Sequence, residues 1–148
     1  MKSVFYTLLL VVFAGQITVA QTWETNLESA QALATKENKP IILVFKGSDW
    51  CAPCIKLDKE IFTTETFQQY AKKHFVLLEA DFPKRKKNAL APTLQSANDA
   101  LAERYNKRGI FPFVVLLNAK GDVMGETGYF KTTPKGYIKH LEQKMKDI

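Results

Sequence analysis

The 148-residue sequence predicts a single α/β domain, and three observations support that class. Residues 41–45 form an apolar run without polar alternation, which is typical of a central strand covered on both faces. A helical segment and a second apolar strand at residues 75–81 follow, and this order indicates a parallel crossover. Residues 113–117 and 122–127 flank a turn at residues 118–121 that ends in glycine, which predicts an antiparallel hairpin.

Helices are predicted around these strands, because capping residues precede segments that have one apolar face. Trp23 is expected in a short first strand or a cap ahead of them. A capping box at residues 25–28 starts the first helix, and Asn38 and Pro40 stop it. A second helix is expected over residues 51–62, and a third after Thr63-Thr64, ending at His74. A fourth runs from a capping box at residues 96–99 to Gly109, and the last starts at Thr133-Pro134.

The first twenty residues have the pattern of a signal peptide. Lys2 supplies a positive start, residues 4–14 are apolar, and Ala20 offers a small residue for cleavage. The apolar stretch is short for a membrane span, although an uncleaved anchor is the alternative interpretation. We therefore expect residues 1–20 to be removed and residues 21–148 to form the domain, exported to the periplasm or the extracellular space.

Composition and charge narrow the class of partner. The chain is 46% hydrophobic and 24% charged, which is ordinary for a globular protein. Its formal net charge of +6 is moderate and falls short of the dense basic stripe of a nucleic-acid binder. We expect no nucleic-acid partner, no stable membrane insertion after cleavage and, because no dimerisation segment is visible, a monomer.

Cys51 and Cys54 are the only cysteines, and they lie where the first long strand passes into a helix. A disulfide between them closes a loop of four residues, which constrains little of the unfolded chain, so a chemical role is favoured over a structural one. At the helix start, free backbone N–H groups and the helix dipole stabilise Cys51 as the attacking thiolate. Cys54 lies one turn further in, is expected to be less exposed, and suits the resolving role. Pro53 holds the first turn.

Two neighbouring residues have competing interpretations. Asp58 follows Cys54 by four residues, so helical spacing places it below the sulfurs, where it could move a proton to or from Cys54. The alternative is a solvated charge near Lys56 and Lys59. Trp50 is either a surface platform for a partner or a core aromatic.

The cysteine pair also has two non-catalytic interpretations. It could be half of a metal site completed by His74 and His140, although these spacings match no zinc pattern. It could instead be an inert disulfide in a binding module that recognises partners through Trp50 and the basic run at residues 84–87. That run is most simply a solvated loop, but it could also attract an acidic partner or anionic lipid heads.

Two motifs together resemble the thioredoxin superfamily: Trp50-Cys51-Ala52-Pro53-Cys54 after a central strand, and Gly109-Ile110-Phe111-Pro112 before the hairpin. The resemblance covers most of the chain after residue 20. It implies the thioredoxin fold, a three-layer domain with a central mixed sheet flanked by helices. It also implies that Pro112 is a cis-proline facing the dithiol and that the backbone beside it pairs with an extended substrate strand.

The chain is most similar to exported thioredoxin-like proteins and to the C-terminal domain of the bacterial transmembrane disulfide reductase. Asp58 matches an acidic active-site position of that domain. There is one departure, because many thioredoxins carry a buried aspartate six residues before the first active cysteine, where this chain has Phe45. If that acid helps to deprotonate the resolving thiol, this chain must use Asp58, water or no group at all for the proton transfer.

The sequence thus predicts an exported thiol–disulfide oxidoreductase. Cys51 attacks, Cys54 resolves, and Trp50, Pro53, Phe111 and Pro112 frame the substrate groove. The Ala-Pro dipeptide between the cysteines resembles that of reducing thioredoxins and favours a protein-disulfide reductase or general dithiol exchanger over an oxidase or isomerase. The expected substrates are exported proteins that contain disulfides. We also expect a separate redox partner for this protein, and we expect it to need neither a cofactor nor a metal.

Overall fold

The computed structural model describes residues 22–146, so the predicted signal peptide, residues 1–20, lies outside the described part of the chain. Five strands form one sheet in the order β1-β3-β2-β4-β5. The strands are β1 (Trp23–Glu24), β2 (Ile41–Lys46), β3 (Val76–Asp81), β4 (Phe113–Leu117) and β5 (Val123–Thr127). The helices are α1 (Leu27–Glu37), α2 (Ala52–Leu57), the π-helical segment η1 (Asp58–Phe62), α3 (Glu65–His74), the 3₁₀ turn η2 (Lys86–Asn88), α4 (Pro92–Tyr105) and α5 (Pro134–Lys146).

The sheet is mixed, as the sequence predicted. The central strand β2 pairs parallel with β3 and antiparallel with β4, and β4 pairs antiparallel with β5. Residues 41–45 of β2 are all buried, which confirms the interpretation of the unbroken apolar run. The carboxyl end of β2 and the start of β4 meet where Phe45 pairs with Phe113, so the loops that follow β2 and precede β4 lie at one end of the sheet.

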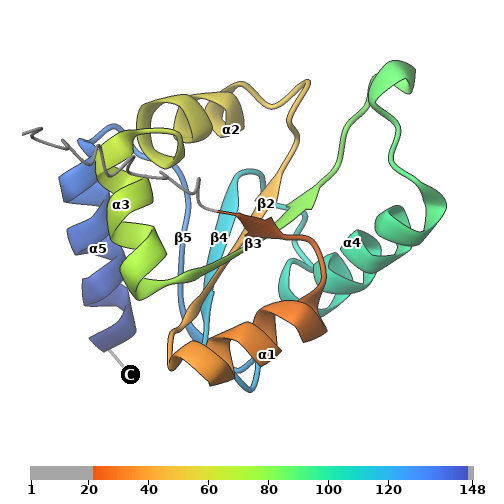
Figure 1. Cartoon of the computed structure of the whole chain (residues 1–148). Helices are drawn as coiled ribbons and strands as arrows, with labels where there is room; N and C mark the ends of the chain where they lie inside the picture. The colour runs from red at the N-terminus through yellow and green to blue at the C-terminus, as the bar shows by residue number, and fades with distance from the viewer. Residues whose placement is uncertain (1–21, 147–148) are drawn as a thin grey trace, which may run out of the picture.

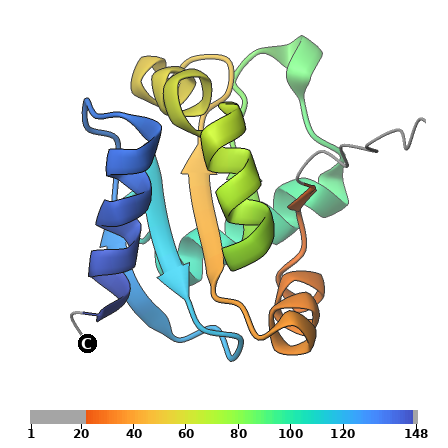
Figure 2. The same ribbon diagram turned by 60° about the vertical axis from the view of Figure 1, so that its left-hand side comes forward.

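Helices cover both faces of the sheet, which gives three layers (Figure 1). On one face, α2, η1, α3 and α5 pack over a cluster that includes Ile42, Val44 and Tyr137. Figure 2 shows α3 and α5 in front of the strands on this face. On the other face, α1 and α4 cover a cluster that includes Leu43 and Phe113. Because successive side chains of β2 point to opposite faces, this one strand contributes to both clusters.

Two predicted helix starts were displaced. The cap of α1 is Asn26, whose side chain accepts a hydrogen bond from the Ser29 N–H, and not the first residue of the capping box at 25–28. Helix α4 begins at Pro92, so the expected capping box at 96–99 lies inside it. Proline fits the first helical turn because it lacks an N–H that would be unpaired there, and this starts the helix five residues earlier. The same helix ends at Tyr105, before Gly109.

The remaining helices begin and end close to their predicted limits. The segment after Cys51 is helical as far as Phe62, but its second half is π-helical. Thr64 caps α3, and α5 starts at Pro134. None of the helices described between residues 22 and 146 combines the length and the apolar character needed to cross a bilayer.

Candidate active site

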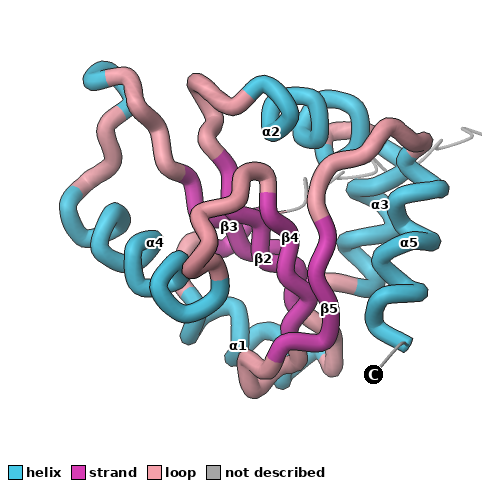
Figure 3. Tube along the Cα trace, turned by 180° about the vertical axis from the view of Figure 1, so that it is seen from behind, coloured by secondary structure: helices cyan, strands magenta, loops and turns pink. Residues whose placement is uncertain are grey.

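Cys51 caps α2 and Cys54 lies in its first turn, shortly after β2 ends at Lys46. Figure 3 shows α2 beyond the end of the sheet. Cys51 has extended backbone angles and caps the helix, and its Sγ atom accepts a hydrogen bond from the Cys54 N–H at 3.3 Å. The two sulfurs form a disulfide with an S–S distance of 2.06 Å and a Cα–Cα distance of 5.2 Å. The cap thus directs a backbone donor at the sulfur that the sequence identified as the nucleophile.

Both cysteines are buried. Cys51 is 4% exposed and Cys54 is 3% exposed, so the predicted order of exposure holds by only a small margin. The two residues between them, Ala52 and Pro53, are exposed on the outer side of the first turn. The disulfide is therefore nearly covered, and the exposed residues next to it are those of the first helical turn.

Trp50 and Phe111 form an aromatic surface beside the disulfide. Trp50 is 38% exposed, so the core-aromatic interpretation of this residue is wrong. Its ring packs edge-on against Phe111, with the ring centroids 5.5 Å apart. The Phe111–Pro112 peptide bond is cis, as the resemblance implied, and Pro112 directly precedes β4 at the end of the sheet where β2 ends. The two motifs that are far apart in the sequence therefore meet here.

Asp58 lies one helical turn after Cys54. Its backbone N–H bonds to the carbonyl oxygens of Cys54 and Ile55, and it stands at the junction between α2 and η1. The residue is half-buried. Phe45, at the position where many thioredoxins carry an acid, is fully buried and stacks on Phe113 with a centroid distance of 6.2 Å. Asp58 is accordingly the acidic residue that helical spacing places nearest to Cys54.

Sequence reasoning missed the residues that fix the loop before Cys51. The backbone N–H and the hydroxyl of Ser48 donate to the Asp81 carboxylate, at 2.9 and 2.6 Å. The indole N–H of Trp50 donates to the Phe82 carbonyl oxygen at 2.7 Å. These partners lie more than thirty residues away in the sequence. The only local signal was the polar character of Ser48 and Asp49, which does not identify a distant partner.

Asp49 binds the segment that follows β3. Its carboxylate accepts hydrogen bonds from the backbone N–H groups of Lys84 and Arg85, at 2.9 and 3.0 Å, and from the Asn88 side-chain amide at 2.8 Å. The bond from the Lys84 N–H is the main cause that holds the pKa of Asp49 below its usual value, with Asn88 and Arg85 adding to it. Asp49 is thus an ionised anchor for a loop rather than a group in contact with the sulfurs.

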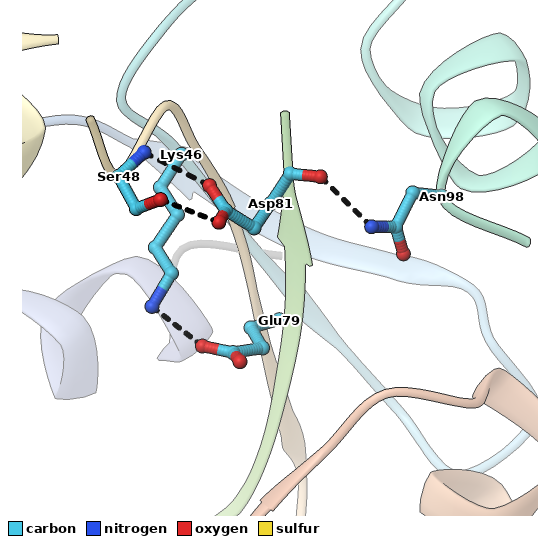
Figure 4. Close-up of polar contacts among 5 residues, drawn as sticks. All are labelled: Lys46, Ser48, Glu79, Asp81 and Asn98. Atoms are coloured by element: carbon cyan, nitrogen blue, oxygen red, sulfur yellow. Dashed lines mark hydrogen bonds and ion pairs between the residues drawn. The ribbon is translucent and has the colours of Figure 1, made fainter. Parts of the chain in front are cut away.

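Figure 4 shows how this network continues into the sheet. Asp81, at the end of β3, receives the two bonds from Ser48 through its side chain and one from the Asn98 amide, at 2.9 Å, through its backbone oxygen. Next to it, the Lys46 ammonium and the Glu79 carboxylate form an ion pair between β2 and β3 at 2.5 Å. The loop before Cys51 is therefore connected to α4 through the end of β3.

The metal-site interpretation finds no support in the geometry. His74 stacks on Tyr70, with the ring centroids 4.1 Å apart, and His140 pairs with the Thr127 hydroxyl at 2.8 Å. Burial and the nearby Lys144 lower the pKa of His140. Over residues 22–146, no three His, Cys, Asp or Glu side chains gather in a way that could hold a metal ion.

Comparison with known proteins adds four findings. The profile of the family described as Thioredoxin-like matches residues 22–119. The chain is 31% identical over 124 residues to Disulfide bond reductase DsbH of Chlamydia pneumoniae, covering 84% of this chain and 72% of that protein. Among solved structures, DsbH Oxidoreductase matches with a TM-score of 0.78 and 29% identity, covering 87% of each chain. The reduced DsbD C-terminal domain of Neisseria meningitidis matches with a TM-score of 0.51 and 25% identity, covering 80% of this chain and 93% of the domain.

Proposed function

Because the chain belongs to the Thioredoxin-like family and has the thioredoxin fold that its sequence predicted, we propose that it is a thiol–disulfide oxidoreductase that reduces protein disulfides. The observation that carries this proposal is the Cys51–Cys54 disulfide at the start of α2, with the Cys54 N–H donating to Cys51 Sγ. A donor aimed at this sulfur also stabilises the thiolate that forms when the disulfide is reduced.

The reaction transfers two electrons in two exchanges. In the reduced protein, the Cys51 thiolate attacks one sulfur of the substrate disulfide, forms a mixed disulfide and releases the other substrate sulfur as a thiolate. Cys54, after losing its proton, attacks Cys51 Sγ and releases the second substrate thiolate. The substrate gains two electrons, and its two thiolates take up two protons, one released by Cys54 and one from solvent. The protein returns to the Cys51–Cys54 disulfide described here. An external dithiol must then reduce it again.

Asp58 is proposed to handle the proton of Cys54, directly or through a water molecule. Its support is the one-turn spacing from Cys54 and the phenylalanine at position 45, which leaves no acid at that buried site. Trp50, Pro53, Phe111 and Pro112 are proposed to frame the substrate groove. The support for this role is that Pro53 lies exposed between the cysteines and that Trp50, which directly precedes Cys51, contacts Phe111 and offers exposed aromatic area to a partner.

The direction of electron flow is inferred from two observations. The residues between the cysteines are alanine and proline, with no cation to stabilise the thiolate strongly, and strong stabilisation accompanies an oxidising pair. The relative with 31% identity is named a disulfide bond reductase. We infer that this protein acts in the same direction, on exported substrates, because residues 1–20 have the pattern of a signal peptide.

Two cysteine variants test the enzyme proposal. Turnover of a peptide disulfide, driven by dithiothreitol, should fall to the uncatalysed rate in Cys51→Ser, because the attacking sulfur is gone. Cys54→Ser should accumulate a mixed disulfide through Cys51, visible by mass spectrometry as protein plus substrate. A wild-type protein that exchanges with no peptide would instead favour the binding module with an inert disulfide. Asp58→Asn, in the same assay, should slow the resolving step more than the first attack.

The reduction potential distinguishes a reductase from an oxidase. Equilibration of the purified protein with glutathione should give a potential near about −270 mV, in the range of reducing thioredoxins. A potential near about −120 mV would assign the oxidising direction and contradict the reductase proposal.

A further inference from the structure

Four consecutive cations occupy the loop between β3 and α4. Here the basic loop means residues 82–91, and its cations are Lys84, Arg85, Lys86 and Lys87. All four are exposed. The ion pairs among the described residues are formed by other cations. None of these four side chains therefore lies within ion-pair distance of a carboxylate in that part of the chain. A charged and unpaired run of this kind is usually a solvated loop, unless something fixes its position.

This loop is fixed, and it is fixed to the residues that precede Cys51. Asp49 accepts hydrogen bonds from two of its backbone N–H groups, and the Trp50 indole donates to the carbonyl oxygen of Phe82. Ser48 binds Asp81, directly before the loop. Ser48, Asp49 and Trp50, which directly precede Cys51, therefore each form a hydrogen bond with a residue in the loop or next to it. Figures 1 and 3 show the loop at the same end of the sheet as the start of α2.

The loop also contributes to the aromatic surface beside the disulfide. The Lys84 ammonium lies 3.8 Å from the centre of the Trp50 ring, within the range of a cation–π contact. Phe82 packs edge-on against Phe111, with a centroid distance of 5.6 Å. The cations thus extend the surface formed by Trp50 and Phe111. Asp49, which binds the loop backbone, carries one negative charge against the four positive charges of residues 84–87.

We propose that residues 84–87 form a recognition surface for an acidic segment of the substrate protein that flanks its disulfide. This inference rests on the function proposed above. Complementary charge beside the reacting sulfurs accelerates encounter and fixes the register of the bound segment. An acidic protein segment is preferred over a membrane surface as the occupant, because a bilayer lying on these cations would cover the aromatic surface that the substrate must reach.

Three disulfide peptides that differ only in flanking residues test this surface. One carries aspartates on both sides of the disulfide, one carries serines and one carries lysines. At about 20 mM NaCl, kcat/KM should be about tenfold or more higher for the acidic peptide than for the neutral one, and lowest for the basic peptide. The difference should shrink severalfold at about 300 mM NaCl, because salt screens exposed charges.

A triple variant separates charge from loop anchoring. Asp49 binds backbone N–H groups and not the charged side chains, so Arg85→Gln/Lys86→Gln/Lys87→Gln removes charge while the anchor is kept. This variant should lose most of the preference for the acidic peptide and keep its rate on the neutral one. The matched control is Lys36→Gln/Lys72→Gln/Lys73→Gln, which removes three exposed cations from the last turns of α1 and α3. It should retain the preference.

The possible outcomes separate the two proposals. Absence of exchange with all three peptides would contradict the enzyme proposal, and the recognition surface with it. Exchange at equal rates on all three peptides would overturn the recognition surface alone. An equal loss of preference in both triple variants would overturn it as well, because net charge and not the basic loop would then be responsible. Equal peptide rates together with binding to phosphatidylglycerol vesicles, lost in the loop variant, would assign the cations to a membrane.

Discussion

At the scale of single residues, Asp49 connects the segment before Cys51 to the basic loop. Its carboxylate accepts three hydrogen bonds from the basic loop, and these bonds favour the ionised form. The pKa of Asp49 is therefore lower in the folded protein than the usual value of 3.8. A lowered folded pKa contributes stability that is present above the unfolded value and is lost as the pH falls through the folded value.

Protonation of Asp49 should release the basic loop. The amide proton shifts of Lys84 and Arg85, followed by NMR during an acid titration, should change together with a midpoint below 3.8. Asp49→Asn should remove this transition, since the amide does not titrate, and should leave the amide of Ser29, which is bound to Asn26, unaffected. Independent midpoints for the two amides, or a midpoint above 3.8, would contradict the role of Asp49 as their shared acceptor.

The residue scale also shows where sequence reasoning stops. The Cys-x-x-Cys motif, Trp50 and cis-Pro112 could be located because each belongs to a short motif whose residues adjoin one another. Asp49 could not be assigned a role, because its hydrogen-bond partners are 35 to 39 residues away in the sequence and only the fold brings them close. Its position beside Trp50 was visible, but its hydrogen bonds were not.

At the scale of elements, α4 is held to the sheet by a buried polar contact. Asn98 is 1% exposed, and its amide N–H donates to the Asp81 carbonyl oxygen at 2.9 Å. Within the described residues, its side-chain oxygen is buried and has no hydrogen-bond partner. The sequence placed Asn98 in a capping box, since Ser, Asn and Asp are common at helix starts. Pro92 started the helix earlier, which left Asn98 free to face β3.

Asn98→Ala should destabilise the protein by about 1–3 kcal/mol, because the Asp81 carbonyl oxygen loses its donor in a partly buried site. Urea unfolding followed by circular dichroism gives this value. Ser96→Ala, at an exposed position on the same helix, is the control and should change stability by less than about 0.5 kcal/mol. If the two variants are equally stable, the Asn98 contact does not hold α4 to the sheet.

At the scale of the whole molecule, one sheet separates two apolar clusters that share no residues. Successive side chains of β2 point into alternate clusters: Ile42 lies in one and Leu43 in the other, and both are fully buried. The fold class, the central place of β2 and the hairpin of β4 and β5 could be predicted because unbroken apolar runs and a glycine turn are local signals. The pairing of β1 with β3 could not, since a strand of two residues carries almost no pattern.

Shortening a buried side chain on either face of the sheet should destabilise the whole domain. Ile42→Ala and Leu43→Ala should each lower the free energy of unfolding by about 2–5 kcal/mol. Fluorescence of Trp23 and Trp50 and far-UV circular dichroism should show one shared transition in each variant. Val123→Ala, at a side chain that is 46% exposed, is the control and should stay within about 0.5 kcal/mol. Separate transitions for the two probes would show that the faces unfold independently.

The anchoring of the basic loop through its backbone has an evolutionary consequence. Asp49 holds the amide groups of residues 84 and 85, which every amino acid except proline supplies, whatever its side chain. Substitutions along this loop can therefore change its charge while the backbone hydrogen bonds to Asp49 are kept. Under the proposed recognition role, exchanging a few of these surface side chains would change which substrates are preferred, while the loop keeps its anchor.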